Sequence, residues 1–296
     1  MLAKNPFRHL TGGVVVTDEK MSKHTSLGVG GPAKYFSTPT SFNVFKEVTD
    51  IAKFNNIPIK VIGNGTNLLV SDNGFNGLIV SMKKFNGIRV LSGGRVSAYS
   101  GENLKTLILL LAKKGLTGLE ELSGIPATVG GAVFQNAGAF NKSISDSLES
   151  VKIFDGRIKT LSKEECEFSY RESKFKKTGG IILSATFNLK SADEESINKK
   201  LAVYNSIRKS KQPTGKTCGS VFINSGEISA GSLIEQAGLK GFSVGGATIS
   251  NKHANFIINK GSSAEDVYLL IEYAKRKVYK TLGVKLKEEV EIVGEF

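Results

Sequence analysis

The segment "GNGTN" at residues 63–67 has the composition of a loop that could bind an anion. It follows the apolar run "IPIKVI", which is typical of a strand. Glycine tolerates positive φ, so successive backbone N–H groups can converge on a phosphate, and Thr66 and Asn67 add side-chain donors. Taken alone, the loop is more simply an ordinary turn, since Asn-Gly is a common turn pair. The dinucleotide fingerprint G-x-G-x-x-G is absent, which argues against a Rossmann fold but not against a nucleotide.

A longer run of small residues lies at 123–140. Its sequence, "SGIPATVGGAVFQNAGAF", holds four glycines, four alanines and no charged side chain. Such residues bury little apolar area, so they cost stability unless another body fills the space. Close packing of a helix on a sheet is one explanation. The length of the run, with Asn136 as a lone amide inside it, favours a large flat ligand, with its pyrophosphate at 63–67 and its rings at 123–140.

These segments lie where predicted helices, strands and glycine-rich loops alternate. Apolar spacing predicts a helix at 44–54, and Asn103 is placed to cap a second helix that ends at Gly115. A capping box at Ser162 and Glu165 predicts a short helix, and a charged helix is expected at 192–211. Strands are expected at 57–63, 77–82 and 179–189, with hairpins at 87–101 and 149–162 that turn on Gly93-Gly94 and Asp155-Gly156.

The composition changes near Pro213. A short helix is expected at 229–238, and a capping box at Ser263 and Asp266 begins a helix that runs to Gly283. Strands are expected at 217–224, 253–261 and 284–296. The sequence therefore predicts an α+β chain with a glycine-rich first part and a smaller second part.

Length and charge limit the possible functions. The chain has 296 residues, of which 40% are hydrophobic, so it can form two or three domains. Its formal charge is +13, yet the lysines are scattered. No basic run and no interleaving of aromatic with basic residues points to nucleic acid. A lysine-rich solvated surface explains the charge, and attraction of an anionic small substrate is the alternative.

The cysteines and the N-terminus bear on the cellular compartment. Cys166 and Cys218 lie far apart, and the three histidines have no metal-ligand spacing. Two separate thiols suit a reducing cytosol. The first residues lack a hydrophobic signal core, and no apolar run is long enough to span a bilayer. We therefore expect a soluble cytoplasmic protein without a metal site.

Seven segments occur in the order found in one enzyme family. They are "HTSLGVGGPAKYF", "VIGNGTNLLVSDNGFNGLIV", "GLEELSGIPATVGGAVFQNAGAF", "FSYRESKF", "KQPTGKTCGSVFIN", "AGSLIEQAGLKG" and "KEEVEIVGE". From about residue 22 to the C-terminus, the chain resembles the UDP-N-acetylenolpyruvoylglucosamine reductases (UDP-N-acetylmuramate dehydrogenases) of bacterial peptidoglycan synthesis. The short path from Tyr170-Arg171 to "GSVF" is similar to the compact, second type of this family.

The resemblance implies a fold and a cofactor site. The fold would be α+β, with a two-subdomain FAD-binding domain of the vanillyl-alcohol-oxidase kind and a smaller α+β substrate-binding domain. We expect the first subdomain at 1–82, with 284–296 returning to it, the second at 83–200, and the substrate-binding domain at 201–283. The residues implied to contact FAD are Gly63, Asn64, Gly65, Thr66, Asn67, Gly124, Ile125, Thr128, Gly130, Gly131, Asn136 and Gly138.

The resemblance also implies a reaction. NADPH would reduce non-covalently bound FAD, and the reduced flavin would reduce the enolpyruvyl group of UDP-N-acetylglucosamine enolpyruvate to give UDP-N-acetylmuramate. The flavin would carry the redox chemistry, while the protein positions, polarises and protonates. The expected partners are NADPH and the UDP-sugar, without nucleic acid or membrane, and the expected state is a monomer.

Three catalytic residues follow from the family motifs. Arg171 in "SYRES" would stabilise charge that develops on the substrate carboxylate. Ser220 in "CGSVF" would donate a proton, which a serine does only beside strong charge stabilisers. Glu289 matches the family's C-terminal glutamate, but Glu288 and Glu291 are close, and strand alternation does not say which face sees the flavin. Without the motifs, the three would be a surface arginine, a strand serine and an edge-strand carboxylate.

Substrate contacts and departures from the family pattern complete the predicted site. The implied substrate contacts are Tyr170, Lys211, Asn224 and His253. A lysine offers a point charge to the UDP diphosphate. Ala127 replaces the last glycine of "GIPG", and Asn141 follows Phe140 where glycine is usual. Both lie in the expected flavin wall and should alter its fit slightly. Ile223 replaces a basic residue and removes an expected phosphate contact.

Two other functions stay open from the residues alone. A related FAD oxidase acting on another alcohol or sugar would bind flavin but would not need the set Arg171, Ser220 and Glu289. A non-catalytic protein that binds nucleic acid or another anion is supported only by the charge of +13. Such a protein would be colourless, and its affinity for polynucleotide would depend strongly on salt.

Overall fold

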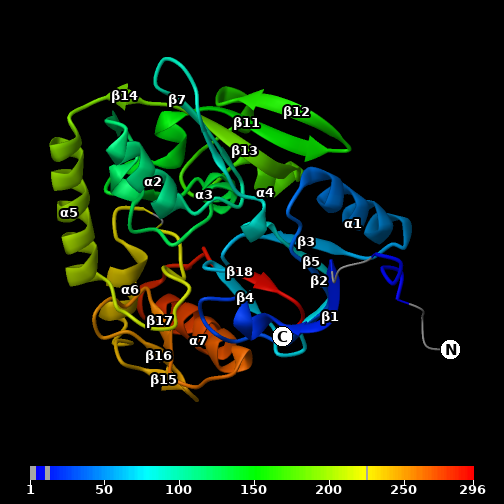
Figure 1. The fold of residues 1–296 in the computed structure, drawn as a ribbon. Coiled ribbons are helices and arrows are strands. Elements are labelled where there is room, and N and C mark those ends of the chain that lie inside the picture. The colour runs from blue at the N-terminus through cyan, green and yellow to red at the C-terminus, as the bar shows by residue number, and fades with distance from the viewer. Residues whose placement is uncertain (1–4, 11–13, 225) are drawn as a thin grey trace.

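Three groups of elements, each with its own sheet, make up the computed structural model of the chain, which describes residues 5–10, 14–224 and 226–296 (Figure 1). The first group has a four-stranded sheet in the order β1–β2–β5–β3, formed by Val15–Lys20, Pro32–Ser37, Phe75–Ser81 and Ile59–Ile62. Helix α1 (Phe42–Phe54) packs against it through Phe45 and Val48, both fully buried. The helix predicted at 44–54 is thus confirmed.

The C-terminus returns to this first group. Strand β18 (Glu291–Val293) pairs in parallel with β4 (Leu68–Val70), as Figure 1 shows in red beside cyan. The expected closing strand at 284–296 is therefore shorter than predicted. Residues 286–290 instead run as an extended segment past the third group, where Leu286 and Val290 are buried.

The second group is an antiparallel sheet in the order β12–β11–β13–β7–β6. Its strands are Arg157–Ser162, Leu148–Asp155, Ile181–Asn188, Arg95–Tyr99 and Ile88–Val90. Both predicted hairpins are confirmed, and Gly93, Gly94 and Gly156 have the positive φ that tight turns need. Short two-residue strands pair at its margins, β8 (Leu116–Thr117) with β14 (Lys190–Ser191) and β9 (Gly138–Ala139) with β10 (Lys142–Ser143).

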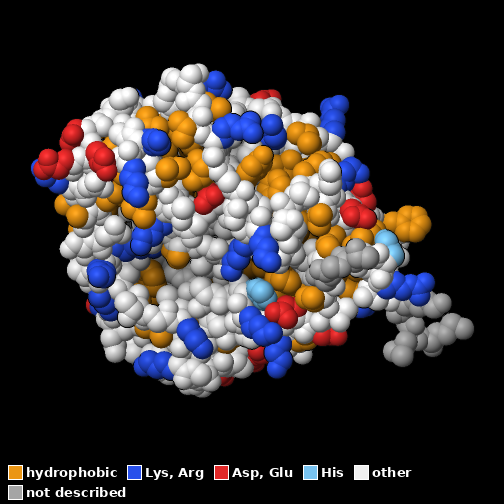
Figure 2. Space-filling model, viewed as in Figure 1, with side chains coloured by type: hydrophobic (Ala, Val, Ile, Leu, Met, Phe, Trp, Pro, Cys, Tyr) orange, Lys and Arg blue, Asp and Glu red, His pale blue; other side chains and the backbone are white. Residues whose placement is uncertain are grey.

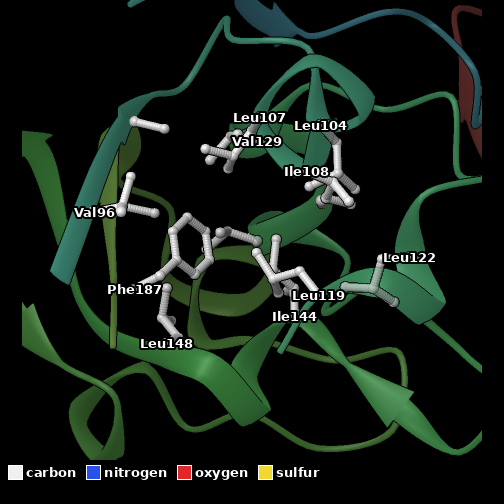
Figure 3. Close-up of a cluster of buried hydrophobic side chains, with 14 of the residues drawn as sticks. Val96, Leu104, Leu107, Ile108, Leu119, Leu122, Val129, Ile144, Leu148 and Phe187 are labelled. Atoms are coloured by element: carbon white, nitrogen blue, oxygen red, sulfur yellow. The ribbon is translucent and has the colours of Figure 1, made fainter. Parts of the chain in front are cut away.

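Four helices belong to this second group. They are α2 (Leu104–Lys113), α3 (Val129–Phe134), α4 (Lys174–Thr178) and α5 (Glu194–Lys211). Asn103 caps α2 as predicted, because its Oδ1 accepts a hydrogen bond of 3.1 Å from Thr106 N. The side chains of α2, α3 and the sheet meet in one core, in which Leu104, Val129 and Phe187 are fully buried (Figure 3).

The third group holds a three-stranded sheet of β15 (Ser243–Val244), β16 (Ala247–Ile249) and β17 (Ile257–Asn259). Helices α6 (Ala230–Gln236) and α7 (Ala264–Leu282) pack with it in a second core. The capping box of Ser263 and Asp266 is present, and Gly283 ends α7 in the left-handed conformation. Both predicted helices of this part are confirmed.

Two predicted elements take other forms. The segment 217–224 is not a regular strand, because it makes only isolated bridges at Ser220 and Phe222. Its other backbone hydrogen bonds join it to the side chain and backbone of Asn255 and to the backbone of Lys287 and Glu289. The box of Ser162 and Glu165 is present, but the helix it begins is a single 3₁₀ turn, Glu164–Cys166.

The helix α5 runs through the predicted boundary between residues 200 and 201. Ile197 and Leu201 on this helix both belong to the core of the second group. The domain boundaries remain a prediction. Among the described residues, none of the helices combines the length and apolar character that crossing a bilayer requires. On the face drawn in Figure 2, Lys and Arg side chains are spread out rather than gathered into one block.

Candidate active site

A cleft of about 930 Å³ lies where the three groups meet. This is a typical volume for a small-molecule site, about 300–1,000 Å³. Its walls are the loop 63–67, the glycine-rich run from 124 to 140, the end of α5, and the segment 217–220. The C-terminal segment reaches it at Glu289 and Glu291. Both segments singled out for their glycines therefore line one cavity.

Most of the predicted site residues line this cleft. They are Gly63, Asn64, Gly65, Thr66, Asn67, Gly124, Ile125, Thr128, Gly130, Gly131, Gly138, Arg171, Lys211, Ser220, His253 and Glu289. Three predicted residues do not line it. Asn136 is buried behind the wall, where its Nδ2 donates to Ser169 O at 2.8 Å. Tyr170 is 55% exposed. Asn224 Oδ1 accepts a hydrogen bond from Ala230 N at the start of α6.

The loop 63–67 packs too tightly for side chains at its glycines. Gly65 has φ +66°, and a Cβ there would collide with the backbone carbonyl of His24. A Cβ at Gly63 would collide with the hydroxyl of Thr128. The backbone of this loop therefore lies directly against two other segments, and glycine is required at both positions.

The asparagines of the loop tie the walls of the cleft together. Asn64 Nδ2 donates to Pro126 O at 3.0 Å, which fixes the glycine-rich run. Asn67 Nδ2 donates to Glu289 O at 2.9 Å, which fixes the C-terminal segment. The loop thus positions a wall of the cleft and one of its carboxylates at the same time.

Three of the four glycines in the run 123–140 lie where the chain packs closely against other segments. A Cβ at Gly130 would lie 2.7 Å from Ser100 Cβ, and one at Gly124 would collide with the side chain of Arg208. One at Gly138 would lie 2.6 Å from Lys142 O. Close packing, rather than a ligand, therefore explains these three glycines.

Gly131 is the exception among the glycines of the run. A Cβ there would meet only the hydroxyl of Thr128, at 3.3 Å, and Gly131 lines the cleft. The same hydroxyl caps α3 by accepting from Gly131 N. At this position the small side chain leaves room in the cavity itself.

The proposed catalytic arginine and glutamate meet in the cleft. Arg171 Nε lies 2.9 Å from Glu289 Oε1, and the two side chains are 20% and 16% exposed. The contact is an ion pair rather than a hydrogen bond, because Arg171 Nε has no partner of hydrogen-bond geometry among the described residues. Arg171 Nη2 donates to Gly138 O at 2.9 Å. Burial raises the pKa of the Glu289 carboxyl, while Arg171 and Lys176 act to lower it.

The structure distinguishes the three neighbouring glutamates. Glu288 Oε1 lies 2.5 Å from Lys275 Nζ on α7, and Glu288 does not line the cleft. Glu291 is paired with Lys60 on β3. Only Glu289 faces the arginine from the "SYRES" motif, which supports its selection from the family pattern.

Ser220 reaches the cleft on an extended segment held by a side chain. Phe222 N donates to Asn255 Oδ1 at 2.9 Å, and Asn255 Nδ2 donates back to Phe222 O at 2.8 Å. On the other side, Glu289 N donates to Val221 O at 2.8 Å. The backbone of Asn255 adds a further bond, because its O accepts from Val221 N at 2.9 Å. The segment is therefore held by Asn255 and by the C-terminal segment, without a regular ladder. This backbone pairing places Val221 beside Glu289, and Ser220 and Glu289 line the same cleft.

Four cleft residues escaped the sequence analysis. Arg208 on α5 lies in the lining, burial lowers its pKa, and no carboxylate of the described residues comes within ion-pair distance. Lys176 on α4 also lines the cleft. Ser100 Oγ and Gln135 Oε1 are buried in the lining without a hydrogen-bond partner in the described chain. Of the four, only Arg208 could have been predicted from the sequence. It lies three residues before Lys211 on α5, so the two side chains lie on the same face of the helix.

The departures from the family pattern leave the cleft walls intact. Phe140 and Asn141 have φ of 53° and 60° and form the two-residue turn between β9 and β10. Asparagine tolerates this conformation better than most residues, so it can replace glycine there. Ile223 lies outside the cleft lining, and its N–H donates to Lys287 O. Ala127 lines the cleft, and its O accepts a hydrogen bond of 3.0 Å from Leu104 N at the start of α2.

The lining suits a large anionic ligand. Five Lys and Arg side chains, from Lys60, Arg171, Lys176, Arg208 and Lys211, face two glutamates, Glu289 and Glu291. The buried atoms Ser100 Oγ and Gln135 Oε1 have unused hydrogen-bonding capacity. Together with the open space at Gly131, these features fit FAD, and the residues that would hold it are the loop 63–67 and the run 124–140.

Comparison with known proteins identifies the family. Residues 210–293 match the family "UDP-N-acetylenolpyruvoylglucosamine reductase, C-terminal domain", and residues 33–162 match "FAD binding domain". A UDP-N-acetylenolpyruvoylglucosamine reductase of Anoxybacillus flavithermus is 42% identical over 95% of this chain and 95% of its own length. The chain belongs to the UDP-N-acetylenolpyruvoylglucosamine reductase family. Another relative of that name, from Clostridium novyi, is 45% identical over 93% of this chain and 91% of its own length.

The known structures agree with this family. The crystal structure of UDP-N-acetylenolpyruvylglucosamine reductase from Thermus caldophilus superposes with a TM-score of 0.81 at 38% identity, covering 95% of this chain and 98% of the other. The predicted fold class, a flavin-binding α+β domain with a smaller C-terminal domain, is confirmed. The family predicted from the seven segments is confirmed as well.

Proposed function

We propose that this member of the reductase family converts UDP-N-acetylglucosamine enolpyruvate to UDP-N-acetylmuramate with NADPH, for peptidoglycan precursor synthesis. The observation that carries the proposal is that one cleft is lined both by the residues predicted to bind FAD and by the pair of Arg171 and Glu289. FAD held by the loop 63–67 and the run 124–140 would supply the redox chemistry that links NADPH to the enolpyruvyl group. A flavin oxidase would not need the arginine, the glutamate and the serine in one place.

The chain's own residues hold the substrate and manage its charge. The guanidinium of Arg171 stabilises the negative charge that grows on the substrate carboxylate, because it is fixed by Gly138 O and Glu289 before the substrate arrives. Ser220 Oγ donates the proton to the carbon beside the new C–H bond, and Glu289 keeps the arginine in place. Burial strengthens each of these interactions, since water screens them less.

Binding of the UDP portion falls to the basic side of the cleft. Lys211 and His253 line it, and burial lowers the pKa of His253. A neutral imidazole can both donate and accept a hydrogen bond. Tyr170 and Asn224 lie outside the lining, so they would contact only those parts of the substrate that extend beyond the cleft. We further propose that the enzyme is a cytoplasmic monomer.

The visible spectrum of the purified protein tests this function. We expect the bands of oxidised flavin, bleached by NADPH without oxygen and restored when UDP-N-acetylglucosamine enolpyruvate is added. Restoration by oxygen alone, with no effect of the UDP-sugar, would identify a flavin oxidase instead. A protein that stays colourless in the presence of FAD would contradict the proposal.

A further inference from the structure

Lys176 is a half-buried cation that the proposed mechanism does not use. It lies on α4 and lines the cleft, and its Nζ donates a hydrogen bond of 2.7 Å to Arg171 O. Burial lowers its pKa, and no carboxylate of the described residues lies within 4.0 Å of the ammonium. Burying an ammonium without an ion-pair partner costs free energy. Among the described residues, the hydrogen bond to Arg171 O is the one polar interaction of this ammonium, so its role follows from that carbonyl.

The carbonyl that Lys176 binds belongs to a residue in an unfavourable conformation. Arg171 has φ +57°, which is disfavoured for a side chain other than glycine. It sits in a tight turn in which Ser169 and Glu172 exchange backbone hydrogen bonds of 3.2 and 3.1 Å. The turn is anchored to the glycine-rich run by Asn136, whose Nδ2 donates to Ser169 O.

The φ angle of Arg171 sets the direction of both its carbonyl and its side chain. A return of Arg171 to negative φ would rotate its carbonyl away from Lys176 and would redirect its side chain, which now reaches both Gly138 O and Glu289. The lysine hydrogen bond therefore opposes a backbone motion that would redirect the guanidinium away from the cleft. Ser173, which follows the turn directly, is itself fixed, because its Oγ donates a hydrogen bond of 2.6 Å to Phe134 O.

We propose that Lys176 is a positioning residue, which holds the left-handed backbone of Arg171 and so keeps the guanidinium aimed at the substrate carboxylate. The inference rests on the proposed function, because it gives Arg171 that role. Two other roles for the lysine make different predictions. The ammonium could act directly on bound ligand, or it could act through its charge on the groups around it, which are Glu172, Glu289, Glu291 and Lys287.

The test compares three substitutions of this lysine. Lys176→Met removes the donor, Lys176→Gln keeps a donor without charge, and Lys176→Arg keeps both. Lys177→Met, an exposed neighbour on α4 outside the cleft lining, is the matched control. We expect Lys176→Met to lower kcat by about tenfold, the loss expected for one charge-assisted hydrogen bond, with FAD content and Tm near those of the control. Lys176→Gln should recover most of kcat.

A double substitution separates positioning from direct action. If the lysine acts through the arginine, Arg171→Ala with Lys176→Met will be no slower than Arg171→Ala alone. Independent losses in the double variant would show a direct role and overturn the inference. Rescue by Lys176→Arg but not by Lys176→Gln would assign the effect to charge and overturn it as well. If wild-type protein turns over the UDP-sugar while Lys176→Met keeps full kcat, the inference fails and the proposed function stands; a wild-type protein without this turnover contradicts the function itself.

Discussion

The carboxylate of Glu289 is buried, and burial disfavours its charged form. Burial raises its pKa, and the cations Arg171 and Lys176 oppose that shift. The neighbouring Glu288 has the same chemistry but lies against Lys275 on α7, outside the cleft. Two adjacent residues of one type thus have different surroundings. The difference comes from which segment each side chain faces. Strand alternation alone does not show this, so only the family motif selected Glu289 over Glu288.

Replacing each glutamate by glutamine tests this assignment. We expect Glu289→Gln to lower kcat by about 100-fold or more, because the neutral amide no longer holds the guanidinium of Arg171 through an ion pair. Glu288→Gln removes a pair at the edge of the third group and should cost at most about 1 kcal/mol of stability, with kcat near the wild-type value. Steady-state kinetics at saturating FAD measure both. Equal losses of kcat would reject the choice of Glu289.

At the scale of the element, the short helix α3 presents two glycines with opposite surroundings. A side chain at Gly130 would enter the space of Ser100 behind the helix, whereas one at Gly131 would extend into the cleft. We expect Gly131→Leu to weaken FAD binding at least about tenfold while the apoprotein stays as stable as wild type. Gly130→Leu should instead lower the free energy of unfolding by about 1–3 kcal/mol through overpacking.

Fluorescence titration of the apoprotein with FAD gives the affinity, and thermal unfolding of the same samples gives the stability. The two variants are each other's control, since they add the same side chain one residue apart. If Gly131→Leu binds FAD with wild-type affinity, the flavin does not lie against α3. If Gly130→Leu unfolds like the wild type, close packing behind the helix does not explain that glycine.

Elements whose ends are set by nearby residues could be predicted from the sequence. Segments held by residues far away in the chain could not. The caps Asn103 and Ser263 and the turn glycine Gly156 act within a few residues, so the sequence shows them. The segment 217–224 has the apolar pattern of a strand, yet its hydrogen bonds go to the side chain and backbone of Asn255 and to the C-terminal segment near Glu289, which no local pattern marks. Lys176 was missed for the same reason, because its importance depends on the backbone conformation of Arg171.

The whole molecule brings together groups that lie far apart in the chain. Asn67 and Glu289, which are 222 residues apart, both line the cleft and share a hydrogen bond. Contacts over such separations have no periodicity to reveal them, so the family motifs had to supply the site. The formal charge of +13, by contrast, was visible from the start but did not assign a function. Its meaning depends on where the lysines and arginines lie.

The cleft lining has five Lys and Arg side chains against two glutamates, so we expect a positive local potential that attracts the UDP diphosphate. Added salt should therefore raise KM for the UDP-sugar with kcat unchanged, because the Debye length is only about 10 Å at 0.1 M. Lys211→Gln should raise KM at low salt and flatten its salt dependence.

Lys199 provides the matched control on the same helix. It is exposed and paired with Glu195, outside the cleft, and Lys199→Gln changes the net charge by the same amount. If the local arrangement of charge governs substrate binding, KM of Lys199→Gln will follow the wild-type salt curve. If the two variants flatten the curve equally, the overall charge attracts the substrate, and the cleft has no special share in it. A KM that does not respond to salt in the wild type would reject both accounts.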